Sequence, residues 1–138
     1  MADLSDVARL VAGEQGLSVV STLRADGTIQ SSVVNAGVLG GSGEVAFVVR
    51  GGARKLDYLR ERPQVTVVVR VGWEWVAVEG RARLVGPDDA DPEELRLLLR
   101  EIFTAAGGTH EDFDEFDRVM RAERRTAVLV APSRVYSN

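Results

Sequence analysis

The sequence predicts a mainly β fold with flanking helices, built around a small antiparallel barrel of six to seven strands. Short segments rich in β-branched residues follow one another from 17 to 85, and a strong hairpin signal, Asp26-Gly27, joins the first two. Apolar residues at helical spacing gather near the N-terminus and between 91 and 122. Hairpin-connected strands with few helices favour a barrel.

The N-terminal segment 3–14 is predicted to be a short amphipathic helix capped by Asp3. Gly13 and Gly16 mark its end. Strands are then expected at 17–23, 28–39, 44–49, 65–71 and 73–85. A short helix opening at Arg54 and stopped by Pro63 interrupts this series.

Two of these strands carry apolar residues that a single barrel would leave exposed. The strand 65–71 is apolar on both faces, and the strand 73–85 places Trp73 and Trp75 on its outer face. Strands that are apolar on both sides need partners on both sides. A homodimer packed through these strands is therefore expected.

The C-terminal third is predicted to be mostly helical. Asp91 and Pro92 open a helix that runs to about Ala105. Thr109 is expected to cap a second helix, whose apolar residues are Phe113, Phe116, Val119 and Met120. A last strand is predicted at 126–131. No linker or repeat interrupts the chain, so residues 1–138 are expected to form one domain.

Composition excludes several function classes. The net charge of −4 argues against a nucleic-acid partner. The absence of cysteine excludes disulfides, thiol catalysis and iron–sulfur clusters. His110 is the sole histidine, so a Ser-His-Asp triad could only use this residue. The acidic N-terminus and the lack of a long apolar run predict a cytoplasmic protein without a membrane partner.

Other candidate motifs have simpler interpretations. The glycines between 37 and 43 lie between two strands, where a hairpin loop is expected rather than a nucleotide loop. In the acidic stretch 111–117, Phe113 and Phe116 lie among the carboxylates at helical spacing. Carboxylates opposite such an apolar stripe usually form the solvent-exposed face of a helix, so no metal site is predicted. His110 is expected at the surface.

The most informative stretch predicts an anion site. An apolar run from Val45 ends at Arg50, Gly51-Gly52 follow, and a helix opens with Arg54 and Lys55, the only lysine. Cations at a helix N-terminus oppose the helix dipole unless an anion lies nearby. Free N–H groups at such an end bind anions well. The alternative is that both cations are solvated first-turn residues.

An aromatic wall beside a phosphate site is what a flavin-like molecule needs. Trp73 and Trp75 are candidates for that wall, although core or interface positions are equally compatible. Ser31 and Ser32 could bond the edge of a ring, or they could be ordinary outward strand residues.

Four segments, in this order and spacing, resemble a known family: VVSTLRADGTIQSSVV, RKLDYLRERPQVTVVV, GWEWVAVEGRARLV and FDRVMRAERRTAVLVAPSRVYS. They cover most of the chain and are similar to the split β-barrel proteins related to pyridoxamine 5′-phosphate oxidase. The greater similarity is to the actinobacterial branch that uses the deazaflavin coenzyme F-420. The resemblance implies an FMN-binding-like split barrel and a homodimer with two cofactor sites at its interface.

The resemblance also implies the site residues. Those expected to line the cofactor ring are Gln30, Ser31, Ser32, Val33 and Val34. Those expected to hold the phosphate and the start of the tail are Phe47, Val48, Arg50, Arg54 and Lys55. The other subunit is expected to contribute from its 73–78 strand, with Trp75, Val76 and Ala77. The double arginine Arg124-Arg125 is expected to reach the acidic tail, with Arg124 as the named site residue.

The resemblance implies an oxidoreductase that transfers hydride from reduced coenzyme F-420 to a conjugated double bond of a small organic substrate. FMN is the alternative cofactor, and a protein that only binds or stores the deazaflavin is a further alternative. The chain has no histidine to match those that hold substrate phosphate in the vitamin oxidase, which argues against pyridoxal phosphate synthesis. No catalytic acid or base is identified; solvent, Tyr58 or Tyr136 could supply a proton.

Overall fold

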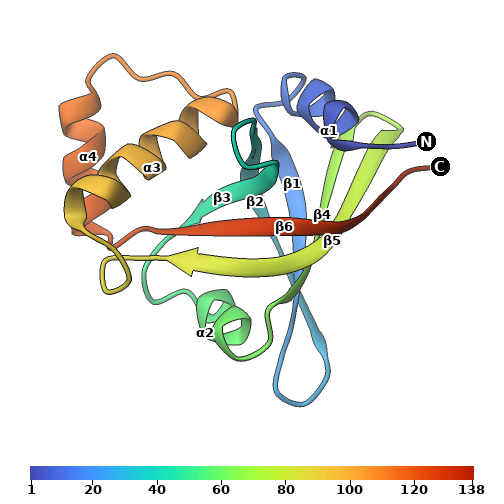
Figure 1. Cartoon of the computed structure of the whole chain (residues 1–138), viewed down its shortest axis with the longest axis horizontal. Coiled ribbons are helices and arrows are strands. Elements are labelled where there is room, and N and C mark those ends of the chain that lie inside the picture. Colours follow the sequence, from blue (N-terminus) through green and yellow to red (C-terminus); the bar gives the residue numbers. More distant parts are fainter.

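The computed structural model describes residues 1–138 and shows a closed barrel of six antiparallel strands with four helices (Figure 1). The elements, in chain order, are α1 (Leu4–Val11), β1 (Leu17–Leu23), β2 (Ile29–Leu39), β3 (Glu44–Val49), α2 (Arg54–Glu61), β4 (Gln64–Val71), β5 (Glu74–Val85), α3 (Pro92–Ala105), α4 (Phe113–Ala122) and β6 (Thr126–Tyr136). The predicted mainly β fold with flanking helices is confirmed.

The strands close in the order β1-β2-β3-β6-β5-β4, and β1 pairs with β4 to complete the ring. The predicted hairpin between β1 and β2 forms, with Gly27 at a φ of 84° in the left-handed region that favours glycine. The long α3–α4 connection lies between β5 and β6, which are themselves paired.

The interior of the barrel holds the larger core. Inward residues alternate along every strand, and the fully buried ones include Val20, Phe47, Val67 and Val78. The helix α1 contributes buried apolar side chains to this core, and so does α2, which lies at the other end of the barrel (Figure 1). Both short helices therefore act as plugs of the barrel.

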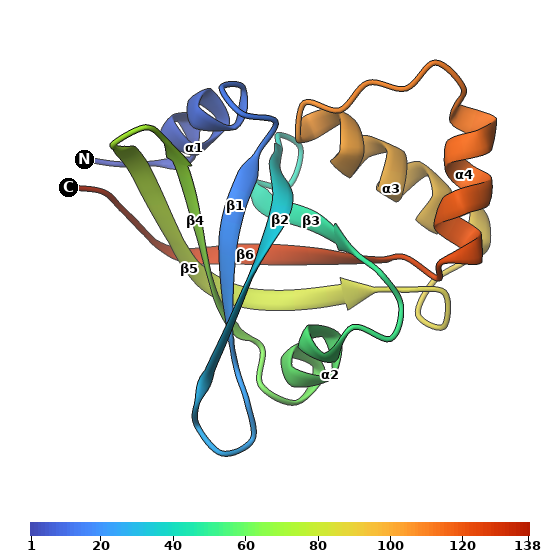
Figure 2. The ribbon, with the colours of Figure 1, turned by 180° about the vertical axis from the view of Figure 1, so that it is seen from behind.

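A second core lies outside the barrel, where α3 and α4 cover the outer face of β3 and β6 (Figure 2). Leu99 and Ile102 of α3 pack there on Ala46 of β3 and Leu129 of β6. Gly37 of β2 allows this close approach, because a Cβ there would lie 2.5 Å from the backbone carbon of Ala105.

Three details of the prediction are wrong. The strand β6 continues to Tyr136 rather than ending at 131. Its register with β5 shifts between Glu79 and Gly80. This irregularity accommodates Pro132, which cannot donate a ladder hydrogen bond. Trp73 lies in the β4–β5 turn after Gly72, not in the strand. The cap of α4 is Asp112, not Thr109, because the Asp112 carboxylate accepts from two first-turn N–H groups.

No helix of the structure combines the length and the apolar character that crossing a membrane requires.

Candidate functional site

The loop between β3 and α2 is shaped by two glycines. Gly52 has a φ of 85°, in the left-handed region. Gly51 donates its N–H to the Glu123 carbonyl at 3.0 Å, and a Cβ on Gly51 would lie 2.7 Å from Arg124 Cβ. The glycine pair therefore lets this loop pass directly against the α4–β6 connection.

The N-terminus of α2 lacks a side-chain cap. Its N-cap is Ala53, which offers no acceptor to the first-turn N–H groups. Arg54 is exposed at the first position of the helix, and Lys55 is half-buried beside it. Uncapped N–H groups and two cations together provide donors for an anion.

Lys55 connects α2 with β2. Its Nζ donates to the Ser32 Oγ at 2.6 Å, so two residues predicted for the site lie in direct contact. Burial lowers the pKa of the Lys55 ammonium, because a less hydrated site disfavours the charged form. One hydrogen bond to a neutral hydroxyl leaves two ammonium donors for another acceptor.

A network of opposite charges extends this region towards β6. The Glu123 carboxylate bonds Arg50 at 3.5 Å through one oxygen and Arg125 at 2.9 Å through the other. Two guanidinium groups thus share one carboxylate, which leaves an excess of positive charge. Arg124 instead pairs with Asp88 at 3.0 Å and has a φ of 50°. The structure brings Arg125, rather than Arg124, into the network that contains Arg50.

The β2 residues predicted to line a ring alternate between two faces. Ser31 is exposed and shares a hydrogen bond of 2.9 Å with the Ser21 hydroxyl. Gln30 is half-buried, and its Oε1 accepts from the Thr22 hydroxyl at 2.9 Å. Val33 is exposed.

Four other predicted residues are buried, so their side chains are not free to contact a ligand. Val34, Phe47 and Val76 belong to the interior core. Ala77 is also buried within the single chain. These positions support the strands and do not present a side chain to a ligand.

Trp75 lies far from α2 within one chain, because β5 begins at the opposite end of the barrel (Figure 1). Its ring packs edge-on against Tyr136, with the ring centroids 6.2 Å apart. The Tyr136 hydroxyl donates to Glu79 at 2.8 Å, and this bond raises the tyrosine pKa. A single chain therefore does not bring Trp75 and Lys55 together.

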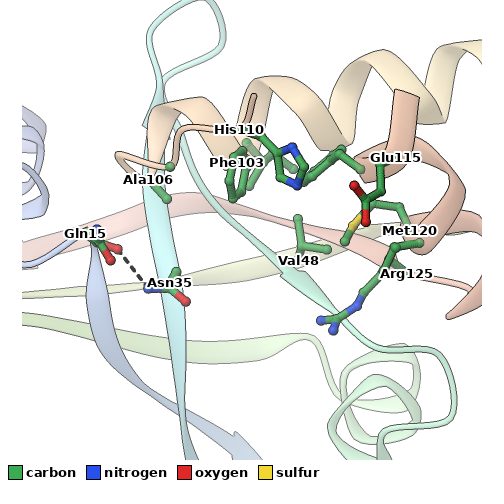
Figure 3. Close-up of a pocket in the computed structure, with 13 residues that line it drawn as sticks. Gln15, Asn35, Val48, Phe103, Ala106, His110, Glu115, Met120 and Arg125 are labelled. Atoms are coloured by element: carbon green, nitrogen blue, oxygen red, sulfur yellow. Dashed lines mark hydrogen bonds between the residues drawn. The ribbon is translucent and has the colours of Figure 1, made fainter. Parts of the chain in front are cut away.

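A cavity of about 400 Å³ lies between the α3–α4 unit and the outer face of β2 and β3 (Figure 3). The predicted site residue Val48 lines it, together with Arg125 of the charge network and His110. His110 was expected at the surface; its side chain is exposed, but it also forms part of this wall.

Comparison with known families matches residues 4–138 to pyridoxamine 5′-phosphate oxidase. The chain belongs to this family. The resemblance found in the sequence is thereby confirmed, and the family includes oxidoreductases. The pyridoxamine 5′-phosphate oxidase fold accounts for nearly the whole chain.

Solved structures share this fold at low sequence identity. A conserved hypothetical protein of Mycobacterium tuberculosis, Rv2991, is 18% identical, with a TM-score of 0.72, and the match covers 98% of this chain and 83% of that one. A protein named F420 reductase is 15% identical, with a TM-score of 0.66, covering 91% and 93%. An FMN-binding relative from Nostoc punctiforme is 13% identical, with a TM-score of 0.67, covering 96% and 79%.

Sequence reasoning missed two parts of this region. The role of Glu123 was missed, and so was its link between Arg125 and Arg50, because only the contact of Gly51 with the α4–β6 connection brings these residues together. The cavity beside Val48 was also missed, because its aromatic wall comes from residues 103–116, whose periodicity indicated only helix packing. The adjacency of the two glycines was the one available signal for the close approach.

Proposed function

We propose that this member of the pyridoxamine 5′-phosphate oxidase family is an oxidoreductase that binds the deazaflavin coenzyme F-420 and reduces a conjugated double bond of a small organic substrate. The observation that carries the proposal is the contact between Lys55 and Ser32 at the uncapped start of α2, directly after the Gly51-Gly52 loop. This arrangement favours a ligand with an anionic handle.

The residues at this end of the barrel fit a phosphate-bearing group. Arg54 and Lys55 offer charged donors, and the first-turn N–H groups of α2 add neutral ones. Arg50 and Arg125 extend the positive charge beyond the loop, with Arg124 close by in the chain. A run of guanidinium groups suits a ligand whose anionic groups continue past the first phosphate.

That extended charge supports the deazaflavin over FMN, since the deazaflavin bears the longer anionic tail. The structural similarity to a protein named F420 reductase supports the same choice. FMN remains the alternative, and the likeness to an FMN-binding relative supports it. When bound, the reduced cofactor supplies the hydride.

The chain's own residues would bind, orient and shield. Lys55 and Arg54 would hold the anionic handle, and Ser32 would keep the Lys55 ammonium aimed at it. The outward side chains of Ser31 and Val48 would contact the ring, whereas Val34 and Phe47 would support the strands from inside the barrel. Water exclusion at such a site requires a further covering surface.

A second copy of the chain is proposed as that cover. An apolar row crosses the outer sheet face, where Val33 pairs with Val19 and Val19 pairs with Val68. Val33 is 64% exposed and Val19 is 44% exposed, and both lie within regular strands of the sheet. Pairing through this face would bury the row, and it would bring the partner's Trp75 strand towards the α2 end. Sedimentation velocity measures the association.

Cofactor titration tests the function. Purified wild-type protein should quench F-420 fluorescence on binding and should bind F-420 more tightly than FMN. Lys55→Ala should raise the Kd for F-420 by about 10- to 100-fold, because a charge-assisted hydrogen bond contributes about 1.5–3 kcal/mol. Arg118→Ala, at an exposed arginine of α4, is the matched control and should leave the Kd unchanged.

The outcomes separate the alternatives. Absence of binding for both cofactors would refute the proposal. Preferential binding of FMN would make FMN, rather than F-420, the cofactor of this protein. Binding of F-420 without oxidation of the reduced form by a panel of enones and quinones would favour a storage protein.

A further inference from the structure

The cavity beside Val48 has an aromatic wall. Phe103 and Phe116 lie with ring centroids 4.8 Å apart, and the His110 ring lies 5.9 Å from Phe116 and 6.4 Å from Phe103. Met120 lines the same space (Figure 3). Flat rings with a thioether beside them favour a planar apolar ligand.

One hydrogen bond orients the His110 ring. Its Nδ1 accepts the backbone N–H of Asp112 at 3.0 Å. With Nδ1 occupied, Nε2 is the ring nitrogen left to contact a ligand. The far rim of the cavity is fixed as well, because the Asn35 amide donates to the Gln15 carbonyl at 2.9 Å (Figure 3).

One side of the cavity is positively charged. Arg125 lines it, and the only carboxylate that pairs with Arg125, that of Glu123, is shared with Arg50. The group formed by Arg50, Glu123 and Arg125 therefore carries one positive charge more than its carboxylate neutralises. Glu115 also lines the cavity, but its side chain is exposed, so solvent screens its charge.

We propose that this cavity binds a planar aromatic carboxylate of one or two fused rings. The rings lie against Phe103, Phe116 and His110, and the carboxylate faces Arg125. A volume of about 400 Å³ accommodates a two-ring acid. The charge of Arg125 selects the acid over a neutral ring compound of the same shape.

The cavity adjoins the proposed cofactor site, since Val48 lines it and Glu123 links Arg125 to Arg50. Aromatic acids that carry a conjugated carbon–carbon double bond outside the ring, as the acceptor of the hydride and a proton, are therefore assigned as the substrate class of the proposed reductase. This assignment of a substrate role depends on the proposed function, whereas binding of the acid in the cavity does not.

The chain provides its own probes for the test. His110 is the sole histidine and Met120 lines the cavity, so tag-free protein gives an unambiguous imidazole signal and a methionine methyl signal from the cavity wall by NMR. Titration of cofactor-free protein with 2-naphthoate should shift the His110 and Met120 signals saturably. 2-Naphthalenemethanol should bind about tenfold more weakly or worse, because it lacks the charge-assisted bond.

Two variants locate the ligand. Val119→Trp at the exposed rim fills the cavity and should abolish the shifts, whereas Leu97→Trp, at an exposed position of α3 outside the cavity, should not. Arg125→Gln should weaken 2-naphthoate about tenfold while leaving the alcohol unchanged.

Three results would overturn the inference: no shift at saturating 2-naphthoate, equal affinity for acid and alcohol, or retained shifts in Val119→Trp. Displacement of 2-naphthoate by F-420 or FMN would overturn the substrate role, since the cavity would then belong to the cofactor. Failure of the proposed function appears separately, as loss of cofactor binding while the 2-naphthoate shifts persist.

Discussion

Two regions of the outer barrel surface carry apolar residues, but only one is covered by the chain itself. On β3 and β6, Ala46 and Leu129 are buried beneath α3 and α4. On β1 and β2, Val19 and Val33 point outward with no helix over them. The contrast shows that an outward apolar residue predicts a covering surface without predicting which one.

The covered region combines small and large outward side chains. Gly37, Ala46 and Ala127 are small enough for α3 to lie close to the sheet, and Leu39 and Leu129 fill the space beneath the helices. The open region carries Val19 and Val33 without a glycine or alanine beside them that would admit a helix backbone.

The largest expected difference between the regions is in stability. Ile102→Ala removes a fully buried side chain from the sheet-facing side of α3 and should lower the free energy of unfolding by about 2–5 kcal/mol. Val19→Ala in the open region should change it by less than about 0.5 kcal/mol when measured at low protein concentration. Urea denaturation measures the unfolding free energy of both variants. Equal decreases for the two would contradict the difference between the covered and the open region.

A smaller effect is expected from the clamp that holds α4 on α3. Asp117 accepts from Arg100 Nε at 2.9 Å and from Arg96 Nη1 at 3.2 Å. Asp117→Asn should lower the free energy of unfolding by about 1–3 kcal/mol, because it removes charge-assisted bonds at a buried position. Asp114→Asn, at an exposed position of the same helix, is the control and should be nearly neutral.

The clamp also predicts a pH dependence. Hydrogen bonds from Arg100 and then Arg96 lower the pKa of Asp117. A depressed pKa in the folded state means that this stabilisation is present above the ordinary carboxyl pKa of about 4, and is lost as the pH falls through the folded value. Urea midpoints between pH 7 and pH 3 should therefore converge for wild type and Asp117→Asn, and a constant gap would contradict the account.

Substitutions in the open region of β1 and β2 should have the smallest effect on folding stability. They should have the clearest effect on association between copies of the chain. Val33→Lys places a charge at the most exposed end of the apolar row and should convert a dimer to a monomer in sedimentation velocity. Its unfolding free energy at low concentration should stay within about 0.5 kcal/mol of wild type. Val33→Thr preserves the shape and should remain dimeric; a monomeric wild type would refute the interface.

Much of the fold could be predicted from local signals. The Asp26-Gly27 turn and the Asp91-Pro92 helix start both appear as expected, because each depends on residues adjacent in sequence. The end of β6 was placed too early, since Pro132 is a local breaker and only pairing with β5 shows that the ladder continues past it. The cap of α4 was misplaced among neighbouring polar residues.

The candidate site was predicted less completely, because it depends on contacts between distant segments. Lys55 and Ser32 were each identified, but their direct contact requires the packing of α2 at the end of the barrel. Glu123 was not identified, and Arg125 was named only with Arg124 for the acidic tail, because nothing near them in sequence indicates that they meet Arg50. His110 gave no sign of the cavity that it lines.

Closure of the ring by β1 and β4 has a consequence for how copies of this protein can associate. Every strand has two neighbours, so the sheet has no edge strand, and amides without a ladder partner are confined to parts of strands such as residues 29–35 of β2. Contacts between molecules then rely mainly on side-chain shape and charge, which a single substitution can abolish. Such a molecule offers less of a template for edge-to-edge polymerisation than an open sheet does.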